Sequence, residues 1–245
     1  MQLDMFALSI SGRRNNNEDA ICAAPELGLF VVADGMGGYE GGEVASALTI
    51  EAIHELVRRT AGDADVTWPY RIDPERTVGE NELMVATRLA ADRIAARRTG
   101  ALCEMGSTVA AVLLTREHAV IAHVGDSRVY RLRDGALAQL TVDHSLVSQL
   151  VANGMSAEDA ERSPWRHVIT RALGTSSADP EVQREPAHAG DVYLLCSDGL
   201  SEVLEPSELA ALLALPAEDA CRALVAAAYE AGSRDNISAI VVRCL

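Results

Sequence analysis

Lysine is absent from this sequence, in which all 21 basic residues are arginine. Several kinds of phosphate chemistry depend on a lysine and are therefore excluded. They include the Walker A phosphate loop, the kinase-type ATP site, the pyridoxal Schiff base and the lysine-assisted dehalogenase-type phosphatase. Any phosphate site in this chain must instead be built from arginine or from metal ions.

Positive charge is scarce as well, because 36 acidic residues give the 245-residue chain a net charge of −15. Nucleic-acid binding needs a basic surface, so the sequence argues against a nucleic-acid partner. Aromatic residues make up only 4% of the chain, whereas 49% of it is hydrophobic. We therefore expect a sizeable core built mainly from Val, Leu, Ile and Ala.

Long apolar runs and paired cysteines are also missing. Apolar stretches such as 27–33 and 109–114 fall well short of the roughly 18 residues that a membrane span needs, so we expect no membrane insertion. The first ten residues contain no basic residue, which predicts no secretory leader. The five cysteines form no C-x-x-C pair, and none is followed by Arg six positions later, which excludes a cysteine-nucleophile phosphatase loop. Reduced thiols in a cytoplasmic protein are the expectation.

The order of the expected elements predicts one α+β domain over residues 1–245. Hydrophobic periodicity and turn signals indicate strands at 6–11, 28–33, 108–115, 119–124, 128–133, 136–140, 192–196 and 237–243, and helices at 43–60, 74–98, 157–162, 206–215 and 217–231. This order lacks the regular βαβα alternation of a parallel sheet. We therefore predict antiparallel sheets sandwiched by pairs of helices.

Three aspartates stand at the ends of apolar strands, each beside Gly or Ser: Asp34, Asp126 and Asp198. One such aspartate is usually a turn residue, and a glycine-rich segment like that after Asp34 is by itself typical of a strand-to-helix turn. Together with Glu18-Asp19 and Asp235-Asn236, however, they indicate carboxylates that converge on one cleft. Because converging carboxylates repel and no Cys/His cluster has zinc spacing, the oxygen ligands favour Mg²⁺ or Mn²⁺. Two such ions, about 3.5–4 Å apart, activate water and bind phosphoryl oxygens.

Around these residues the sequence closely resembles the metal-dependent Ser/Thr protein phosphatases of the PPM (PP2C) family, in their compact bacterial form. Six segments carry the resemblance, in the family's order and spacing, across essentially the whole chain. They are Arg14-x-x-x-Glu18-Asp19, Val31-Val32-Ala33-Asp34-Gly35-Met36-Gly37-Gly38, Gly106-Ser107-Thr108, Val124-Gly125-Asp126-Ser127-Arg128, Ser197-Asp198-Gly199-Leu200 and Asp235-Asn236. The resemblance implies two stacked antiparallel β-sheets flanked by pairs of α-helices, with a flap at about 143–180 that influences substrate choice.

The resemblance also implies a role for each acidic residue. Asp34, Asp198 and Asp235 would form the catalytic centre with two Mn²⁺ or Mg²⁺ ions, Asp34 bridging both. The Gly35 carbonyl would bind one ion, and Asp198 and Asp235 the other. Glu18 and Asp19 would hold metal-bound waters, Asp126 with Asp198 would bind a third ion, and Arg14 would bind the substrate phosphate through its guanidinium fork.

Two positions depart from the pattern of many eukaryotic members, although both residues are usual in bacterial relatives. Met36 stands where those members have a histidine proposed as general acid, which leaves protonation of the leaving group to a metal-bound water. Ser201 stands where they have an aspartate that binds the third metal, which puts the affinity for that ion in question.

The implied function is hydrolysis of phosphoserine and phosphothreonine in proteins by a hydroxide that bridges the two metals, without a phosphoenzyme. The expected setting is a cytoplasmic monomer that opposes a bacterial Ser/Thr kinase. Three alternatives are a phosphatase dedicated to one regulatory phosphoprotein, a partner of a secretion-system kinase, and a pseudophosphatase that only binds. The complete set of carboxylates argues against the last of these.

Two further patterns carry weaker signals. Asp63-Ala-Asp65-Val-Thr67 matches the D-x-D-x-T motif of haloacid-dehalogenase phosphatases, but that motif needs a buried strand before it and a lysine elsewhere. The six histidines show no ligand spacing. We expect His123 to be structural and His144, at the start of the expected flap, to lie at the edge of the site.

Overall fold

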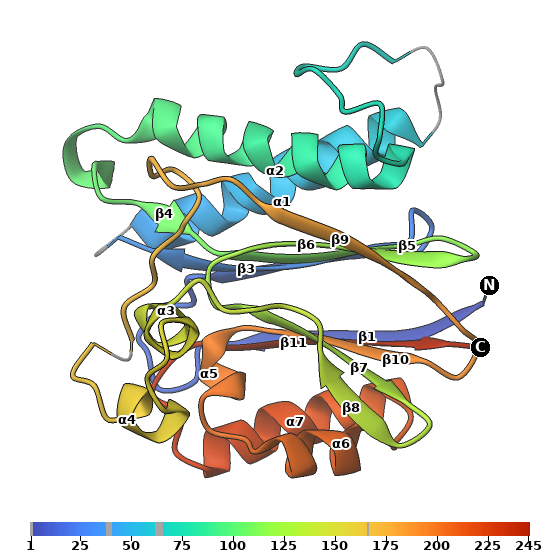
Figure 1. The fold of residues 1–245 in the computed structure, drawn as a ribbon, viewed down its shortest axis with the longest axis vertical. Coiled ribbons are helices and arrows are strands. Elements are labelled where there is room, and N and C mark those ends of the chain that lie inside the picture. Colours follow the sequence, from blue (N-terminus) through green and yellow to red (C-terminus); the bar gives the residue numbers. More distant parts are fainter. Residues whose placement is uncertain (1, 38–40, 62–65, 166) are drawn as a thin grey trace.

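Two antiparallel sheets are stacked face to face between two pairs of helices (Figure 1). The computed structural model describes residues 2–37, 41–61, 66–165 and 167–245. This arrangement confirms the α+β class and the helix–sheet–sheet–helix order of layers that were expected from the sequence.

The two sheets have the strand orders β1-β11-β10-β7-β8 and β2-β3-β5-β6-β9, with the short β4 paired to β3. In the first sheet the strands are β1 (Leu3–Ile10), β11 (Ile237–Cys244), β10 (Val192–Cys196), β7 (Arg128–Arg133) and β8 (Ala136–Gln139). In the second they are β2 (Asp19–Ala24), β3 (Leu29–Met36), β5 (Val109–Leu114), β6 (His118–Val124), β9 (Glu181–Pro186) and β4 (Gly106–Ser107).

One pair of helices covers each sheet. The pair α1 (Gly41–Thr60) and α2 (Val78–Arg97) covers the second sheet, and α6 (Pro206–Leu213) and α7 (Ala217–Glu230) cover the first (Figure 1). The shorter helices are η1 (Gly100–Leu102), α3 (Leu146–Ala152), α4 (Ala157–Glu161) and α5 (Asp198–Ser201). None of the described helices combines the length and the apolar composition that a membrane crossing would require.

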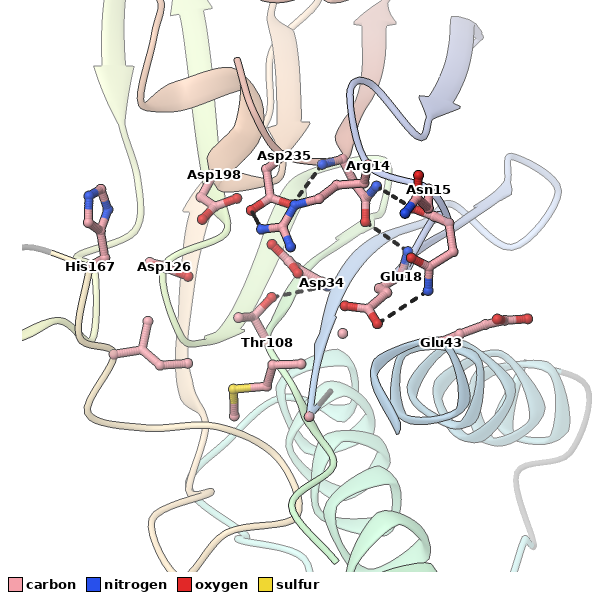
Figure 2. Close-up of a pocket in the computed structure, with 16 residues that line it drawn as sticks. Arg14, Asn15, Glu18, Asp34, Glu43, Thr108, Asp126, His167, Asp198 and Asp235 are labelled. Atoms are coloured by element: carbon pink, nitrogen blue, oxygen red, sulfur yellow. Dashed lines mark hydrogen bonds and ion pairs between the residues drawn. The ribbon is translucent and has the colours of Figure 1, made fainter. Parts of the chain in front are cut away.

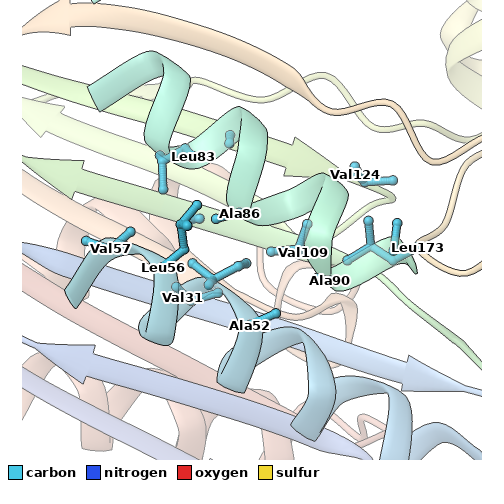
Figure 3. Packing of buried hydrophobic residues seen from close by; sticks show 14 of the residues in the cluster. Val31, Ala52, Leu56, Val57, Leu83, Ala86, Ala90, Val109, Val124 and Leu173 are labelled. Atoms are coloured by element: carbon cyan, nitrogen blue, oxygen red, sulfur yellow. The ribbon is translucent and has the colours of Figure 1, made fainter. Parts of the chain in front are cut away.

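The apolar core has three layers, and the alternation of β3 shows how they form. Leu29 and Val31 point to the layer under α1 and α2, whereas Phe30 and Val32 point to the layer between the sheets. All four are fully buried, which explains why this strand is continuously apolar rather than alternating. In the outer layer, Leu56 of α1 and Leu83 of α2 meet over Val31 (Figure 3).

The structure differs from the expected elements at a few places. The second long helix starts at Val78 instead of residue 74, because Thr77 and Glu80 form a capping box that fixes its first turn. Strand β9 was not expected, since it is an exposed edge strand with the polar sequence EVQREP. Strand β2 and helix α3 were missed as well, whereas the limits of β7 and β10 agree with the expectation.

Candidate metal and phosphate site

A cleft of about 810 Å³ opens at one end of the sandwich, and most of the candidate residues line it. Six acidic residues line this cleft, and five of them, all predicted from the sequence, come from five separate segments of the chain; the sixth is Glu43 (Figure 2). The predicted residues that line it are Arg14, Glu18, Asp34, Gly35, Asp126, Asp198 and Asp235. The acidic groups that the sequence predicted to converge therefore do lie together, although Glu18 and Asp235 are more than 200 residues apart in the chain.

Asp19 lies beside this cleft rather than in its lining. Its Cα is in register with that of Asp34 across β2 and β3, and its side chain is buried. Its Oδ2 accepts hydrogen bonds from Ser197 Oγ at 2.8 Å and from Ser238 Oγ at 2.6 Å. Asp19 thus joins the ends of β10 and β11 in the first sheet to β2 in the second, directly beneath the acidic cleft.

The backbone of Asp34, near the end of β3, is held by Ser107 of β4 and by Thr108, which follows it. The backbone N–H of Asp34 donates to Thr108 Oγ1 at 3.1 Å, and the backbone N–H of Thr108 donates to the Asp34 carbonyl at 2.8 Å. Ser107 Oγ donates to the same carbonyl at 3.1 Å. These bonds fix the backbone that carries the Asp34 carboxylate, a role for Thr108 that the sequence did not reveal.

Gly35 lies where two segments approach its backbone closely. A Cβ atom at this position would lie 2.0 Å from the Gly42 carbonyl oxygen and 2.6 Å from that of Glu18. Only glycine fits between them. The close packing brings the Gly35 backbone to the floor of the cleft, next to Asp34.

Asn236 connects the loop that carries Arg14 and Glu18 to the start of β11. Its Oδ1 accepts a hydrogen bond from the Glu18 N–H at 2.8 Å. Its Nδ2 donates to the carbonyls of Ser11, at 3.0 Å, and Asn16, at 2.8 Å. The sequence pointed to the Asp235-Asn236 pair, but this bracing function depends on contacts with a loop more than 200 residues away and was not visible in it.

Three of the cleft carboxylates, those of Asp34, Asp126 and Asp198, resist ionisation because they are buried and lie near other negative charges. Burial, and then the charges of Asp19, Asp198, Asp126 and Asp235, raise the pKa of Asp34 well above its ordinary value. Burial is also the main cause that raises the pKa of Asp198 to about 8 and the pKa of Asp126 to about 6. Such a cluster is costly when charged unless cations bind to it.

The donor set fits hard divalent cations. Among the described residues, the buried oxygens Asp19 Oδ1 and Asp198 Oδ1 have no hydrogen-bond partner, which leaves them free for other ligands. Carboxylate and carbonyl oxygens are the ligands that Mg²⁺ and Mn²⁺ prefer. The groups around the cleft therefore suit the two-metal centre that was expected.

Comparison with known proteins agrees with this interpretation of the site. The family model described as protein phosphatase 2C matches residues 10–239. The chain belongs to this family. A serine/threonine protein phosphatase PstP of Mycobacterium tuberculosis is 36% identical to this protein phosphatase 2C member over 231 residues, which cover 93% of the chain but 42% of PstP.

Solved structures show the same fold for this protein phosphatase 2C member. The crystal structure of the M. tuberculosis phosphatase PstP/Ppp superposes with a TM-score of 0.86 at 35% identity, covering 99% of this chain and 98% of that one. A catalytic domain of PstP in complex with two manganese ions gives a TM-score of 0.82 at 35% identity, covering 98% and 97%. In that relative, manganese is bound at a site of the same fold.

A second group of possible ligands lies outside the cleft. His123, His144 and Glu181 come from separate segments, and one potential ligand atom of each lies within 4.8 Å of the others. Arg171 Nη1 is 2.9 Å from Glu181 Oε1 and 3.2 Å from His144 Nε2, so a guanidinium already brings positive charge there. The sequence did not reveal this group because its members follow no ligand spacing.

The remaining sequence signals have separate outcomes. His123 Nε2 is 2.9 Å from the Val142 carbonyl, a structural contact of the kind expected for this residue. Met36 lines the acidic cleft, and it has no proton to donate there. The D-x-D-x-T pattern falls at Asp63 and Asp65, which lie outside the described residues.

Proposed function

We propose that this chain is a metal-dependent phosphatase that hydrolyses phosphoserine and phosphothreonine in proteins. The convergence of five predicted carboxylates, with Glu43 and Arg14, on a single cleft is the observation that carries the proposal. Its membership of the protein phosphatase 2C family, and the names of relatives such as PstP, support the same activity. The chain spans less than half the length of PstP, so the proposal extends to the phosphatase domain alone and to no other part of such a relative.

The proposed metal ligands follow from the placement of the oxygen donors. Asp34, the Gly35 carbonyl, Asp198 and Asp235 would bind two Mn²⁺ or Mg²⁺ ions, and Asp126 with Asp198 a third. Glu18 and Asp19 would orient metal-bound waters. When bound, the ions would activate a water nucleophile and neutralise charge on the phosphoryl oxygens. Among the described residues that line the cleft there is no cysteine. The proposed hydrolysis forms no phosphoenzyme.

Arg14 would bind the phosphate of the substrate. Its Nη2 donates to Asp235 Oδ2 at 2.6 Å, and its Nε donates to the Arg234 carbonyl at 3.2 Å. Half of the Arg14 side chain remains exposed, at 53%, on the rim of the cleft. A guanidinium that is anchored through Nε keeps other N–H groups available for two phosphate oxygens at once.

The proposed biological role is to oppose a Ser/Thr kinase as a cytoplasmic monomer, with residues 143–180 acting as a flap that selects among phosphoproteins. The net charge of −15 supports a protein substrate over nucleic acid. A pseudophosphatase is the second candidate, but the complete carboxylate set favours catalysis.

A phosphopeptide assay with and without Mn²⁺ tests the proposal. The wild-type chain should release phosphate only when the metal is present. Asp34→Asn and Asp198→Asn should each lose about 100-fold or more in turnover, since a metal contributes several kcal/mol of charge stabilisation. Full Mn²⁺-dependent turnover in either variant would refute the assignment, and binding of phosphopeptide without turnover by the wild type would favour the pseudophosphatase.

A further inference from the structure

The turn between β6 and β7 carries Asp126 into the cleft, and one side of it packs against Thr108. Gly125 has a φ of +100°, and a Cβ atom there would lie 2.6 Å from Thr108 Cγ2. Ser127 Oγ lies 2.7 Å from Thr108 Oγ1. This side of the turn is therefore fixed by the same residue that holds the backbone of Asp34.

His144 holds the other side of this turn. Its backbone N–H donates to the Gly125 carbonyl at 2.9 Å, and the Gly125 N–H donates to His144 Nδ1 at 3.1 Å. Both polar backbone groups of Gly125, the residue before Asp126, are thus satisfied by His144. The histidine is only 6% exposed, so water cannot easily replace these bonds.

The hydrogen bond from Gly125 determines which ring nitrogen carries the proton. An N–H can only donate, so Nδ1 is the acceptor and, in the neutral ring, Nε2 bears the hydrogen. His144 Nε2 lies 3.1 Å from Glu181 Oε1, to which it donates. Burial, and then the nearby His123 and Arg171, lower the pKa of His144, so the ring is neutral at pH 7.

His144 itself lies in the segment between β8 and β9, residues 140–180, which we name the β8–β9 segment, and it is also bonded to a more distant part of that segment. The His144 carbonyl accepts a hydrogen bond from the Thr170 N–H at 2.7 Å. The neighbouring Ile169 lines the acidic cleft together with Asp126. The histidine therefore contacts both the turn that presents Asp126 and the part of the segment that borders the cleft.

We propose that His144 is a positioning residue that orients Asp126 for metal binding and ties that orientation to the part of the β8–β9 segment around Thr170. The inference rests on the proposed function in one respect, namely that Asp126 binds a divalent ion. Residues that orient metal ligands through hydrogen bonds commonly affect metal affinity or activity by about 10–100-fold. His144 acts through the Gly125 backbone and does not itself touch the substrate.

Two substitutions separate the positioning role from simple packing. In His144→Asn the amide oxygen takes the place of Nδ1 and can still accept from the Gly125 N–H, but the side chain no longer reaches Glu181. In His144→Gln the side chain reaches toward Glu181, but the acceptor for Gly125 is lost. Asp126→Asn serves as the reference for loss of the ligand itself.

Isothermal titration with Mn²⁺ is the primary measurement, accompanied by the Mn²⁺ dependence of phosphopeptide turnover. We expect His144→Gln to weaken the binding of one Mn²⁺ ion by about 10–100-fold, and this should be the same ion whose binding Asp126→Asn weakens. The affinity for the other ions should not change. His144→Asn should restore affinity to near the wild-type value. Circular dichroism and the melting temperature establish that each variant is folded.

Three outcomes would overturn the inference. They are unchanged Mn²⁺ binding in folded His144→Gln, equal losses in His144→Asn and His144→Gln, and a loss spread over all ions. If His144→Gln does not fold, His144→Ala carries the test, because it also removes the acceptor for the Gly125 N–H, and the same ion should then bind more weakly; unchanged binding contradicts the inference. A wild-type chain that binds Mn²⁺ but hydrolyses no phosphopeptide would refute the proposed function, while the titrations still decide the role of His144.

Discussion

Arg14 and Asp235 form an ion pair at the rim of the acidic cleft, with 2.6 Å between Arg14 Nη2 and Asp235 Oδ2. Both side chains are more than a third exposed, so the pair itself adds little to stability. Its significance is positional. The pair places the proposed phosphate-binding group directly beside a proposed metal ligand, from segments at opposite ends of the chain.

Replacement of Arg14 should therefore reduce substrate binding without loss of metal. We expect Arg14→Ala to lower kcat/KM for a phosphopeptide by about 10–100-fold, because a hydrogen bond to a charged group contributes about 1.5–3 kcal/mol. Arg14→Lys should recover only part of this loss, since an ammonium cannot form the two parallel bonds of a guanidinium. Steady-state kinetics at saturating Mn²⁺ make the comparison. An increased Mn²⁺ requirement in Arg14→Ala would show that the arginine supports the metals instead.

Much of the site could be predicted because its carboxylates follow directly from local patterns. Asp34 and Asp198 come at the ends of apolar runs that are long enough to be recognised as strands, so their place at the end of a strand is visible in the sequence. The residues that hold these carboxylates in place through hydrogen bonds follow no such pattern. Asn236 bonds Glu18 across 218 positions, and Thr108 bonds Asp34 across 74, and no periodicity encodes these partners.

The fold shows the same division between local and distant information. Strands β7 and β10 have limits that hydrophobic patterns define well, because their buried residues contrast with polar neighbours. Strand β9 forms because its backbone pairs with the edge of β6. Its polar side chains therefore did not indicate a strand. The contacts of His144 likewise depend on β9 and on the rest of the β8–β9 segment, where sequence patterns predicted only the helix at 157–162.

The metal-free protein should lose stability as the pH rises from about 4 to about 8. The pKa of Asp198 is raised from 3.8 to about 8 in the folded chain, so its protonated form favours the native state, and this contribution disappears as the carboxyl ionises. The raised pKa of Asp126, about 6, acts in the same direction over a narrower range. Thermal melts of chelator-treated protein across this range test the slope.

Two controls make the pH experiment specific to the acidic cleft. Saturating Mn²⁺ should raise the melting temperature most at the upper end of the range, because the ions compensate the ionised carboxylates. Asp198→Asn mimics the protonated side chain and should flatten the pH dependence of the metal-free protein. A melting temperature of the metal-free wild type that rises steadily from pH 5 to pH 8 would contradict this account.

Loss of Asn236 should destabilise the fold as well as the site. Asn236→Ala removes three hydrogen bonds to the backbone of the loop that bears Arg14 and Glu18, at a position that is 4% exposed. Each buried group left without a partner costs about 1–3 kcal/mol. Asn236→Asp keeps the acceptor for the Glu18 N–H and should be intermediate, as measured by urea unfolding. Equal stability of all three proteins would show that the loop is held by other contacts.

Ser201 offers a way to strengthen the proposed third metal site. Its Oγ is buried without a hydrogen-bond partner among the described residues, and Ser201 lines a groove together with Asp126 and Asp198. Ser201→Asp should therefore tighten binding of one additional Mn²⁺ by at least about tenfold, since a unit charge at about 4 Å is worth about 4 kcal/mol at an effective dielectric constant of 20. The same substitution should lower the melting temperature of the metal-free protein, because a further carboxylate joins a cluster that already resists ionisation. Ser201→Asn has a similar shape without the charge and should show neither effect in calorimetric titrations, whereas a matching gain in Ser201→Asn would mean that shape and not charge is responsible.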